Sequence, residues 1–326
     1  IGMRHLKKAE LHAHLNGCIP TDKVRELIVR FGVRIPARFD VQTDLNVLAP
    51  VKSLRRYFKP WKVLKKLPQG RECLREMVLA ACQSLAHDNV VYAELRNSPF
   101  NIPRLNSISL HESLEWLTSA VEDAAVLCGV KCKLVLSITR HKFHPNHAPE
   151  LLQAIKRVNS RRTIVGMDIS GDEDAPIDKD IARFFRKAKG ELGLGITIHA
   201  GETGRLENVR WAIEHCSADR LGHGLAIAKS PKVMQKVVAR DICVEVCLTS
   251  NLRSGQVRRI EEHPIRRFID FDIPFVLCSD NPQVHCATLS DEYELFIQHF
   301  NRRDLIDGMH EKQIQYSFAT KLNRVQ

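Results

Sequence analysis

An imidazole and a carboxylate lie three residues apart in the stretch 197–203, which reads Thr-Ile-His-Ala-Gly-Glu-Thr. Residues 193–198 before them are rich in β-formers, so we expect a strand that ends near His199. Gly201 lets the backbone turn, and Glu202 can then face the same space as His199. This arrangement is typical of a metal ligand followed by a general acid or base.

Two further histidines alternate with other residues in 7–15, which reads KKAELHAHL. Side chains two residues apart lie on the same face of a strand, so His12 and His14 could hold one metal ion between them. Taken alone, the pair fits two hydrogen-bonded histidines of a core or surface more simply than it fits ligands.

The elements that position these residues alternate regularly between strand and helix. Strands are predicted at 7–15, 90–99, 132–139, 163–169, 194–198, around Leu221, at 242–248 and at 275–278. Helices are predicted at 21–31, which Thr21 caps, and at 71–88, 111–129, 148–158, 178–191, 205–216, 231–239 and 264–270. Eight strands, each followed by a helix, predict an α/β fold of the closed (β/α)₈ TIM-barrel type. At 326 residues the chain is long enough for this barrel and is expected to form a single domain.

Active sites of such barrels lie at the carboxyl ends of the strands. In this chain those ends carry His12 and His14, Glu94–Asn97, Asp168–Glu173, His199 with Glu202, His223, Thr249–Asn251, and Asp280 with Asn281. The set His12, His14, His199 and Asp280 offers three imidazoles and a carboxylate, which are donors that suit Zn²⁺. Asp172 and Glu173 are interpreted as structural carboxylates of a loop. Motifs of other metal and nucleotide sites, such as H-E-x-x-H, a P-loop or P-C-x-x-C, do not occur.

The net charge and the composition of the chain limit the kinds of molecule that it is expected to bind. A formal net charge of +11 will attract anions, which leaves nucleic acid, phosphorylated metabolites or simply a basic surface open. No apolar run approaches the roughly 18 residues of a membrane span, so no membrane partner is expected. Ten cysteines without a C-x-x-C pair predict buried thiols and a cytoplasmic location. Ile1-Gly2, ahead of Met3, resembles the remnant of an expression tag.

Residues 52–71 contain eight Lys or Arg and no acid, with apolar residues at nearly helical spacing. We expect a basic helical insertion after the first strand, broken at Pro60 and Pro68. It is either a helix pair with a solvated basic side or a cap over a pocket that receives an anionic group.

Five motifs in this order resemble the adenosine deaminase family of the metal-dependent amidohydrolase superfamily. They are His12-Ala13-His14-Leu15-Asn16-Gly17, Gly166-Met167-Asp168-Ile169-Ser170-Gly171-Asp172-Glu173, His199-Ala200-Gly201-Glu202, Arg220-Leu221-Gly222-His223-Gly224 and Ser279-Asp280-Asn281-Pro282. The resemblance implies that one catalytic zinc ion is bound by His12, His14, His199 and Asp280. It implies that Glu202 protonates the purine N1, that His223 orients and helps to deprotonate the attacking water, and that the backbone of Gly171 lies by N3. The activity implied is zinc-dependent hydrolytic deamination at C6 of a purine, which gives an inosine-type product and ammonia or an alkylamine.

Two positions depart from the pattern that many members of the family share. Asn281 replaces a second aspartate after the last ligand, and its amide N–H can still donate to the purine N7. Asn16 stands where adenosine deaminases usually carry an aspartate that meets the ribose 5′-hydroxyl, and without that charge a 5′-phosphate is not repelled.

The form HAHLNG and the stretch 245–251 resemble the branch of the family that deaminates N6-methyl-AMP. The resemblance and the basic insertion favour a 5′-mononucleotide (AMP, dAMP or N6-methyl-AMP) over a nucleoside. Candidates for the phosphate contact are Lys59, Lys62, Lys65 and Arg71.

Two alternatives stay open from the sequence. A deaminase of another amino-heterocycle, such as adenine or an aminodeoxyfutalosine-like nucleoside, would use the same fold. A basic nucleic-acid-binding or assembly protein with a degenerate enzyme core is less favoured, because every expected ligand and acid/base position is filled.

Overall fold

The computed structural model describes residues 2–322, and the side chains of residues 2–320. Ile1, half of the predicted tag remnant, lies outside the described residues. Eight parallel strands are hydrogen-bonded in chain order, each to the next. They are β1 (Lys8–His14), β2 (Val90–Asn97), β3 (Lys131–Thr139), β4 (Ile164–Ser170), β5 (Gly195–Ala200), β6 (Arg220–His223), β7 (Cys243–Val246) and β8 (Phe275–Leu277).

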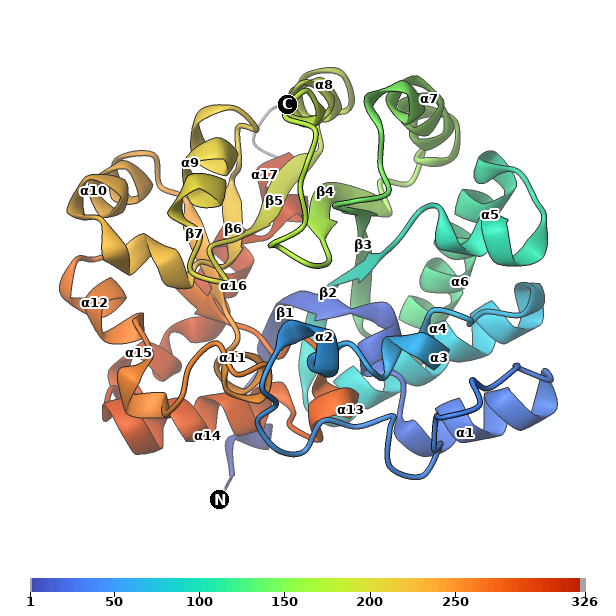
Figure 1. Ribbon diagram of the computed structural model, residues 1–326, viewed down its shortest axis with the longest axis horizontal. Helices are drawn as coiled ribbons and strands as arrows, with labels where there is room; N and C mark the ends of the chain where they lie inside the picture. The colour runs from blue at the N-terminus through green and yellow to red at the C-terminus, as the bar shows by residue number, and fades with distance from the viewer. Residues whose placement is uncertain (1, 323–326) are drawn as a thin grey trace.

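The first and last strands are joined by a bridge between Ala13 and Asp280. The backbone N–H of His14 donates to the carbonyl of Asp280 at 2.9 Å, and the N–H of Asp280 donates to the carbonyl of His12 at 2.9 Å. The bridge brings the sheet round into a barrel, and helices surround it (Figure 1). The predicted (β/α)₈ TIM barrel is confirmed.

The longer helices follow the strands around the ring. They are α1 (Thr21–Arg30), α4 (Gly70–His87), α6 (Leu110–Cys128), α7 (Ala148–Val158), α8 (Ile181–Leu192), α9 (Leu206–Glu214), α10 (Pro231–Ala239), α12 (Ile265–Asp270), α14 (Leu289–Phe300) and α16 (Met309–Tyr316). Shorter helices are α2 (Leu54–Tyr57), α3 (Trp61–Leu64), α5 (Asn101–Asn106), α11 (Leu248–Arg253), α13 (Pro282–His285), α15 (Arg303–Asp307) and α17 (Phe318–Leu322). Among residues 2–322, no helix is both long and apolar enough to cross a membrane.

The sequence of α8 explains why these helices pack as they do. Ile181, Phe184, Phe185 and Ala188 recur at helical spacing and are buried, while the charged residues between them face solvent. Gly193 ends the helix with φ of 65°, a left-handed conformation in which its N–H reaches back to the carbonyl of Ala188.

Two local predictions are wrong. Thr21 does not cap α1 but is its first residue, after Pro20, and its hydroxyl accepts a hydrogen bond from Asn46 Nδ2 at 2.9 Å. The strand predicted at 242–248 ends at Val246, because β8 ends at Leu277 and offers no partner beyond it. The following residues form α11 instead.

The basic insertion lies between α1 and α4 and contains α2 and α3. Ser53 caps α2 by accepting a hydrogen bond from the Arg56 N–H at 3.4 Å, and Pro60 precedes α3. Leu54 and Tyr57 are buried. The insertion therefore packs by an apolar side and leaves basic residues toward solvent, and its role as a cap over a pocket stays a prediction.

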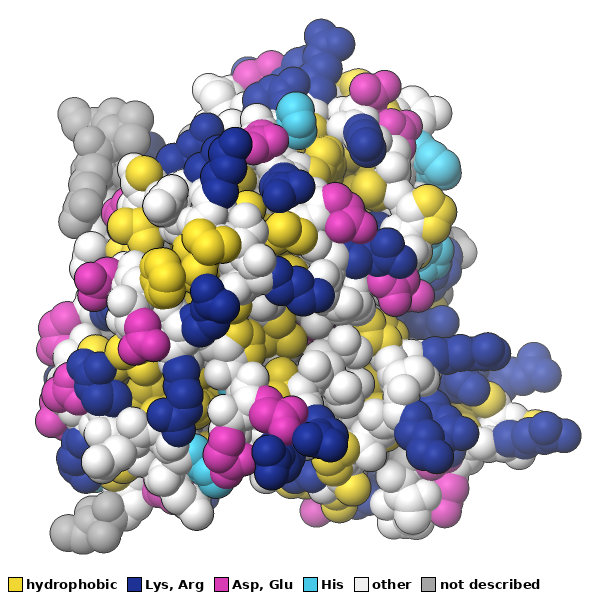
Figure 2. Space-filling view, turned by 60° about the vertical axis from the view of Figure 1, so that its left-hand side comes forward, with side chains coloured by type: hydrophobic (Ala, Val, Ile, Leu, Met, Phe, Trp, Pro, Cys, Tyr) yellow, Lys and Arg dark blue, Asp and Glu magenta, His cyan; other side chains and the backbone are white. Residues whose placement is uncertain are grey.

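Acidic residues are interspersed among the basic ones on the outer surface. Figure 2 shows one face on which many Lys and Arg side chains stand beside Asp and Glu side chains, although several basic side chains gather at its lower right. Lys236 pairs with Glu214, for example, and Arg258 Nη2 lies 3.0 Å from Glu262 Oε1. These basic side chains are thereby neutralised locally, and the net charge of +11 is what remains after the acids are counted.

Charged side chains fill the barrel interior below the strand ends. Arg96 Nη2 lies 2.6 Å from Glu245 Oε1, Arg220 Nε lies 3.0 Å from Glu245 Oε2, and Arg220 Nη2 lies 2.6 Å from Glu94 Oε2. None of these four side chains is exposed. We call them the axial ion network.

Phe318 of α17 lies directly against this network. Its ring centroid is 3.7 Å from the Arg220 guanidinium carbon, and its backbone N–H donates to Glu94 Oε1 at 2.6 Å. A Cβ atom added to Gly166 or Gly195 would lie 2.5 Å or 2.1 Å from the ring, so these two positions leave space for it. Phe318 thus closes the network from solvent on its side.

Replacing Phe318 by Ala should lower the free energy of unfolding by about 3–5 kcal/mol, because it opens a cavity and exposes the network to water. Chemical denaturation measures the change. The matched control Phe271→Ala removes a ring that is 43% exposed and should cost less than about 1 kcal/mol. Equal losses in the two variants would show that Phe318 has no sealing role.

Candidate active site at the mouth of the barrel

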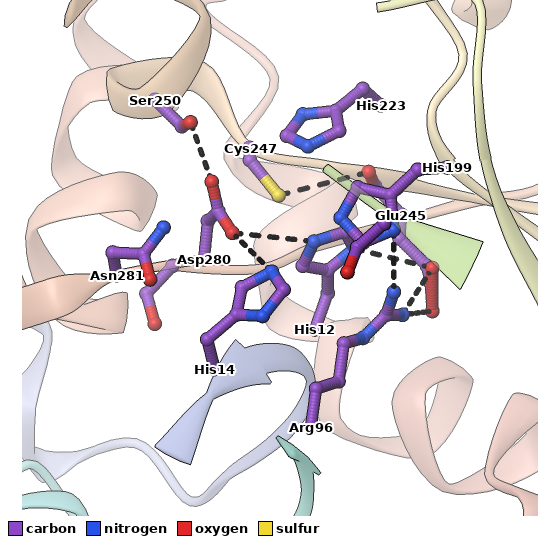
Figure 3. A network of polar contacts seen from close by, with 12 residues as sticks. His12, His14, Arg96, His199, His223, Glu245, Cys247, Ser250, Asp280 and Asn281 are labelled. Carbon is purple, nitrogen blue, oxygen red and sulfur yellow. Dashed lines mark hydrogen bonds and ion pairs between the residues drawn. The ribbon is translucent and has the colours of Figure 1, made fainter. Parts of the chain in front are cut away.

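Metal-capable side chains converge at the carboxyl ends of the strands, which we call the mouth of the barrel. Ligand atoms of His12, His199, His223 and Asp280 lie within 4.8 Å of one another, and all four residues are buried. Figure 3 shows them gathered in one place, although they come from β1, β5, β6 and the turn after β8. These are nitrogen and oxygen donors of the kind that zinc prefers.

His14 lies at the edge of the same group. Its Nε2 is 3.3 Å from Asp280 Oδ1, and its ring centroid is 5.4 Å from that of His199. The structure therefore brings the four residues predicted as ligands together and adds His223 to them.

Asp280 lies between the two histidines of β1. Its Oδ1 is 3.3 Å from Nε2 of both His12 and His14, and its Oδ2 accepts a 2.6 Å hydrogen bond from Ser250 Oγ. Burial alone would raise the pKa of Asp280, but the two imidazoles outweigh burial and hold it well below its usual range. Its φ of 61° is a left-handed conformation that costs about 1–3 kcal/mol in a non-glycine residue. The carboxylate is ionised and held in place by the closed barrel.

Two of the imidazoles have a carboxylate on Nδ1. His12 Nδ1 lies 3.3 Å from Glu245 Oε1, and His199 Nδ1 lies 3.0 Å from Asp168 Oδ1. A carboxylate accepts the Nδ1 proton and leaves the Nε2 lone pair free, which is the usual arrangement around a metal-binding histidine. His12 Nε2 is buried, and apart from the Asp280 carboxylate at 3.3 Å it has no polar partner within the described residues. These nitrogens therefore fit a bound cation.

Glu202 is buried beside His223, with Oε2 at 3.8 Å from His223 Nε2. Burial, and then the negative charges of Asp280, Glu173 and Asp172, raises the pKa of Glu202 well above its usual value. The raised pKa favours the protonated form of the side chain, which can donate a proton.

Glu173 fixes the turn that carries Glu202. It is buried, and its two carboxylate oxygens accept hydrogen bonds from the N–H groups of Gly201 at 2.5 Å and Thr203 at 2.9 Å. Gly201 has φ of 82°, and a Cβ there would lie 2.8 Å from Val209. These contacts agree with the interpretation of Glu173 as a structural carboxylate. Glu173 is buried, whereas its neighbour Asp172 is exposed.

Comparison with known proteins connects this site to a family. Residues 7–324 match the sequence model named adenosine deaminase. The chain belongs to the adenosine deaminase family. An adenosine deaminase of Vibrio cholerae is 32% identical over 300 residues, which cover 89% of this chain and 86% of that protein.

Solved structures of similar fold add to this assignment. The N6-mAMP deaminase of Arabidopsis is 25% identical, with a TM-score of 0.83 over 99% of this chain and 98% of that one. An amidohydrolase of Burkholderia ambifaria with bound zinc is 24% identical, with a TM-score of 0.85 over 98% and 88% of the two chains. The predicted resemblance to the family and to its N6-methyl-AMP deaminase branch is confirmed. The protein is an enzyme of the purine aminohydrolase type, as predicted.

In this adenosine deaminase family member, Asn281 is tied to the insertion. Its Nδ2 donates to the Tyr57 hydroxyl at 3.1 Å, and that hydroxyl lies 2.7 Å from His285 Nε2. Asn281 Oδ1 is buried and has no hydrogen-bond partner within the described residues. The second amide N–H and this oxygen are the groups that Asn281 can offer to a ligand.

Asn16 also contacts the insertion. Its Nδ2 donates to the carbonyl of Leu64 at 2.8 Å, and its Oδ1 accepts from Asn97 Nδ2 at 3.3 Å. Gly171 follows β4 with φ of 102°, close to the start of the loop after β3. The structure places both residues at carboxyl ends of strands, as predicted.

The predicted phosphate contacts differ in their surroundings. Lys59 Nζ lies 2.5 Å from Asp44 Oδ1 and is thus engaged in an ion pair. Among the described residues, Lys62 and Lys65 have no ion-pair partner. Burial, and then repulsion from Lys142 and Arg104, lowers the pKa of Lys65. Because Arg104 and Lys142 follow β2 and β3, Lys65 belongs to a group of cations contributed by three strand ends.

The sequence analysis missed Tyr57 and Glu245. Glu245 could have been noticed as a lone acid inside the apolar run 242–248. Tyr57 carried no such mark, because an aromatic residue in an amphipathic helix usually packs without a polar role.

Replacing Glu173 by Gln should lower kcat/KM about 10–100-fold while metal content stays unchanged, because one acceptor for the 201–203 turn becomes a donor and Glu202 moves. Steady-state kinetics and elemental analysis of the purified variant measure the two effects. Asp178→Asn, at an exposed position of the same loop, is the control and should leave both unchanged. Wild-type kinetics for Glu173→Gln would contradict the positioning role.

Proposed function

We propose that the protein catalyses zinc-dependent hydrolytic deamination at C6 of a purine 5′-mononucleotide, with AMP, dAMP and N6-methyl-AMP as candidate substrates. The observation that carries this proposal is the position of a buried carboxyl with a raised pKa, Glu202, beside a buried group of metal donors. The partner is thus a small molecule, and nucleic acid is not expected to bind.

One zinc ion would be held by His12, His14, His199 and Asp280. Buried His12 Nε2, which has no polar partner but Asp280 within the described residues, the ionised Asp280 and the all-nitrogen-and-oxygen donor set support this assignment. A zinc ion at this place supplies Lewis-acid activation of a water nucleophile near neutral pH.

Residues of the protein itself carry out the proton transfer and bind the purine. Glu202 donates its proton to the purine N1 as water adds to C6, which avoids a full negative charge on the ring. The bond from C6 to the exocyclic nitrogen breaks as C6 becomes a carbonyl. Of the two protons that the water loses, one goes to the nitrogen, which leaves as ammonia or an alkylamine, and the other restores the proton on Glu202. His223 orients the attacking water, Asn281 meets the N7 edge, and the backbone of Gly171 lies by N3.

A phosphate at the 5′ position is supported by two features of the mouth. Asn16 is neutral, so no carboxylate repels an anion there. Lys65 lies in a group of cations with Lys62, Arg104 and Lys142, and their mutual repulsion is relieved when an anion binds. Lys59 is already paired with Asp44, which makes this predicted contact less suitable.

The ten cysteines are free thiols, which supports the prediction of a reducing compartment such as the cytoplasm.

Release of ammonia or methylamine by zinc-loaded protein tests the proposal. AMP, dAMP and N6-methyl-AMP are compared with their nucleosides and with adenine at equal concentration. A larger kcat/KM for the monophosphates supports it. A preference for nucleosides contradicts the phosphate assignment, and turnover of adenine alone favours the alternative of a different amino-heterocycle.

Glu202→Gln should retain zinc and lose about 10²–10⁴-fold in kcat, because the ligands stay while the proton donor is removed. Elemental analysis and ammonia release measure the two effects. The control Glu207→Gln changes an exposed residue of α9 and should match the wild type. Full turnover by Glu202→Gln would rule out the assigned role.

Lys65→Gln should raise KM for AMP about fivefold, which corresponds to about 1 kcal/mol for a partly exposed ion pair, and leave KM for adenosine unchanged. The matched control Lys52→Gln removes an exposed cation from the same insertion and should change neither value. An equal effect of Lys65→Gln on both substrates would place this lysine away from the phosphate.

A further inference from the structure

A chain of hydrogen bonds outside the metal-capable group leads from the backbone of α12 to His223. It begins at the backbone N–H of Ile265, which lies 3.1 Å from His263 Nδ1. A backbone N–H is always a donor, so His263 Nδ1 is an acceptor and carries no proton. Burial lowers the pKa of His263 to about 3, and the ring is neutral with its one proton on Nε2.

The next member of the chain is Asn251 of α11, which is fully buried. Its Oδ1 lies 3.1 Å from His263 Nε2 and accepts a hydrogen bond from the proton on that nitrogen. The amide oxygen is thereby oriented toward His263, and the amide NH₂ faces the other way. Asn251 Nδ2 lies 3.1 Å from His223 Nδ1 and can only donate to it.

The chain ends by fixing the tautomer of His223. Because Nδ1 accepts a hydrogen bond, the neutral ring carries its proton on Nε2. That nitrogen faces Glu202 Oε2 at 3.8 Å, and His223 is one of the residues of the metal-capable group.

The partners of His12 and His199 produce the opposite tautomer. Carboxylates of Glu245 and Asp168 on their Nδ1 atoms place the proton there and leave lone pairs on Nε2. Arg96 Nη1 also approaches His199 Nδ1, but at 3.3 Å against 3.0 Å for the Asp168 oxygen. His12 and His199 thus present a lone pair at Nε2, which suits a metal ligand, whereas His223 presents an N–H donor there.

We infer that Asn251 and His263 are positioning residues that hold His223 as a hydrogen-bond donor at Nε2. His223 is then excluded from the metal ligands, although it lies among them. It directs an oxygen nucleophile, and, contrary to the expectation from the family resemblance, it does not accept a proton at that nitrogen. This inference rests on the proposed function for its catalytic meaning, while the tautomer itself is independent of any substrate.

Nitrogen-15 NMR of histidine-labelled protein, with and without zinc, reads the tautomer directly, and His223→Gln assigns the signals. In the wild type, His223 should show a protonated Nε2 and an unprotonated Nδ1 in both samples. A protonated Nδ1 with an unprotonated Nε2 would overturn the inference.

Asn251→Asp reverses the last hydrogen bond with an isosteric side chain, because a carboxylate accepts from Nδ1. The His223 Nδ1 should become protonated, and kcat for the best substrate should fall about 10–100-fold with little change in KM. An unprotonated Nδ1 in this variant, if it is folded, contradicts the inference. If the variant does not fold, the wild-type spectrum still decides.

A pair of His263 variants provides the matched control. Gln can accept from Ile265 N–H and donate to Asn251 Oδ1, so His263→Gln should keep the wild-type tautomer and kcat. His263→Leu frees Asn251 to turn over and should give both tautomers of His223 and a kcat several-fold lower. Identical spectra for the two variants would show that His263 does not set the direction.

Zinc content, the deamination assay and the NMR spectrum together separate the failure of the inference from the failure of the proposed function. His223→Gln should retain zinc, whereas His199→Gln should lose most of it. If no purine is deaminated but Nε2 of His223 is protonated, the proposed function fails and the tautomer assignment stands.

Discussion

The axial ion network is the constraint on which the rest of the site depends. Glu245 accepts hydrogen bonds from Arg96 at 2.6 Å and from Thr197 Oγ1 at 2.6 Å, and it also touches His12 and Arg220. A buried ion loses several kcal/mol of hydration, so each charge is stable here only while its partners are present. With its contacts to His12 and Thr197, the network links β1, β2, β5, β6 and β7, and it contacts two of the histidines above it, His12 and His199.

The site also departs from ordinary backbone geometry where its chemistry lies. His223 and Asp280 adopt φ of 65° and 61°, which glycine tolerates better than histidine or aspartate. The bridge that joins the first and last strands of the barrel runs through Asp280, so barrel closure holds the strained aspartate beside His12 and His14. Local strain of this kind is commonly found at functional sites, where the surrounding fold overrides the preference of a single residue.

The sequence predicted the barrel and the place of its site because both follow from local patterns. Apolar spacing marks strands and helices, and polar residues at strand ends mark the mouth. What it did not reveal depends on partners distant in the chain: Tyr57 meets Asn281, and Glu173 meets Gly201, only after folding. The end of β7 was misjudged for the same reason, since the length of β8 decides where pairing stops.

Phe318 covers the axial ion network on one side, and this has a consequence for how the chain folds while it is being synthesised. Members of the axial ion network leave the ribosome well before residue 318, so water can still reach Arg220 and Glu94 while the later helices are being made. Phe318 can cover the charges only after all their partners have been made, so no lone buried ion has to be tolerated on that side. Because synthesis runs from the N-terminus, a polar barrel interior can be covered by a helix that is made after all of its charged partners.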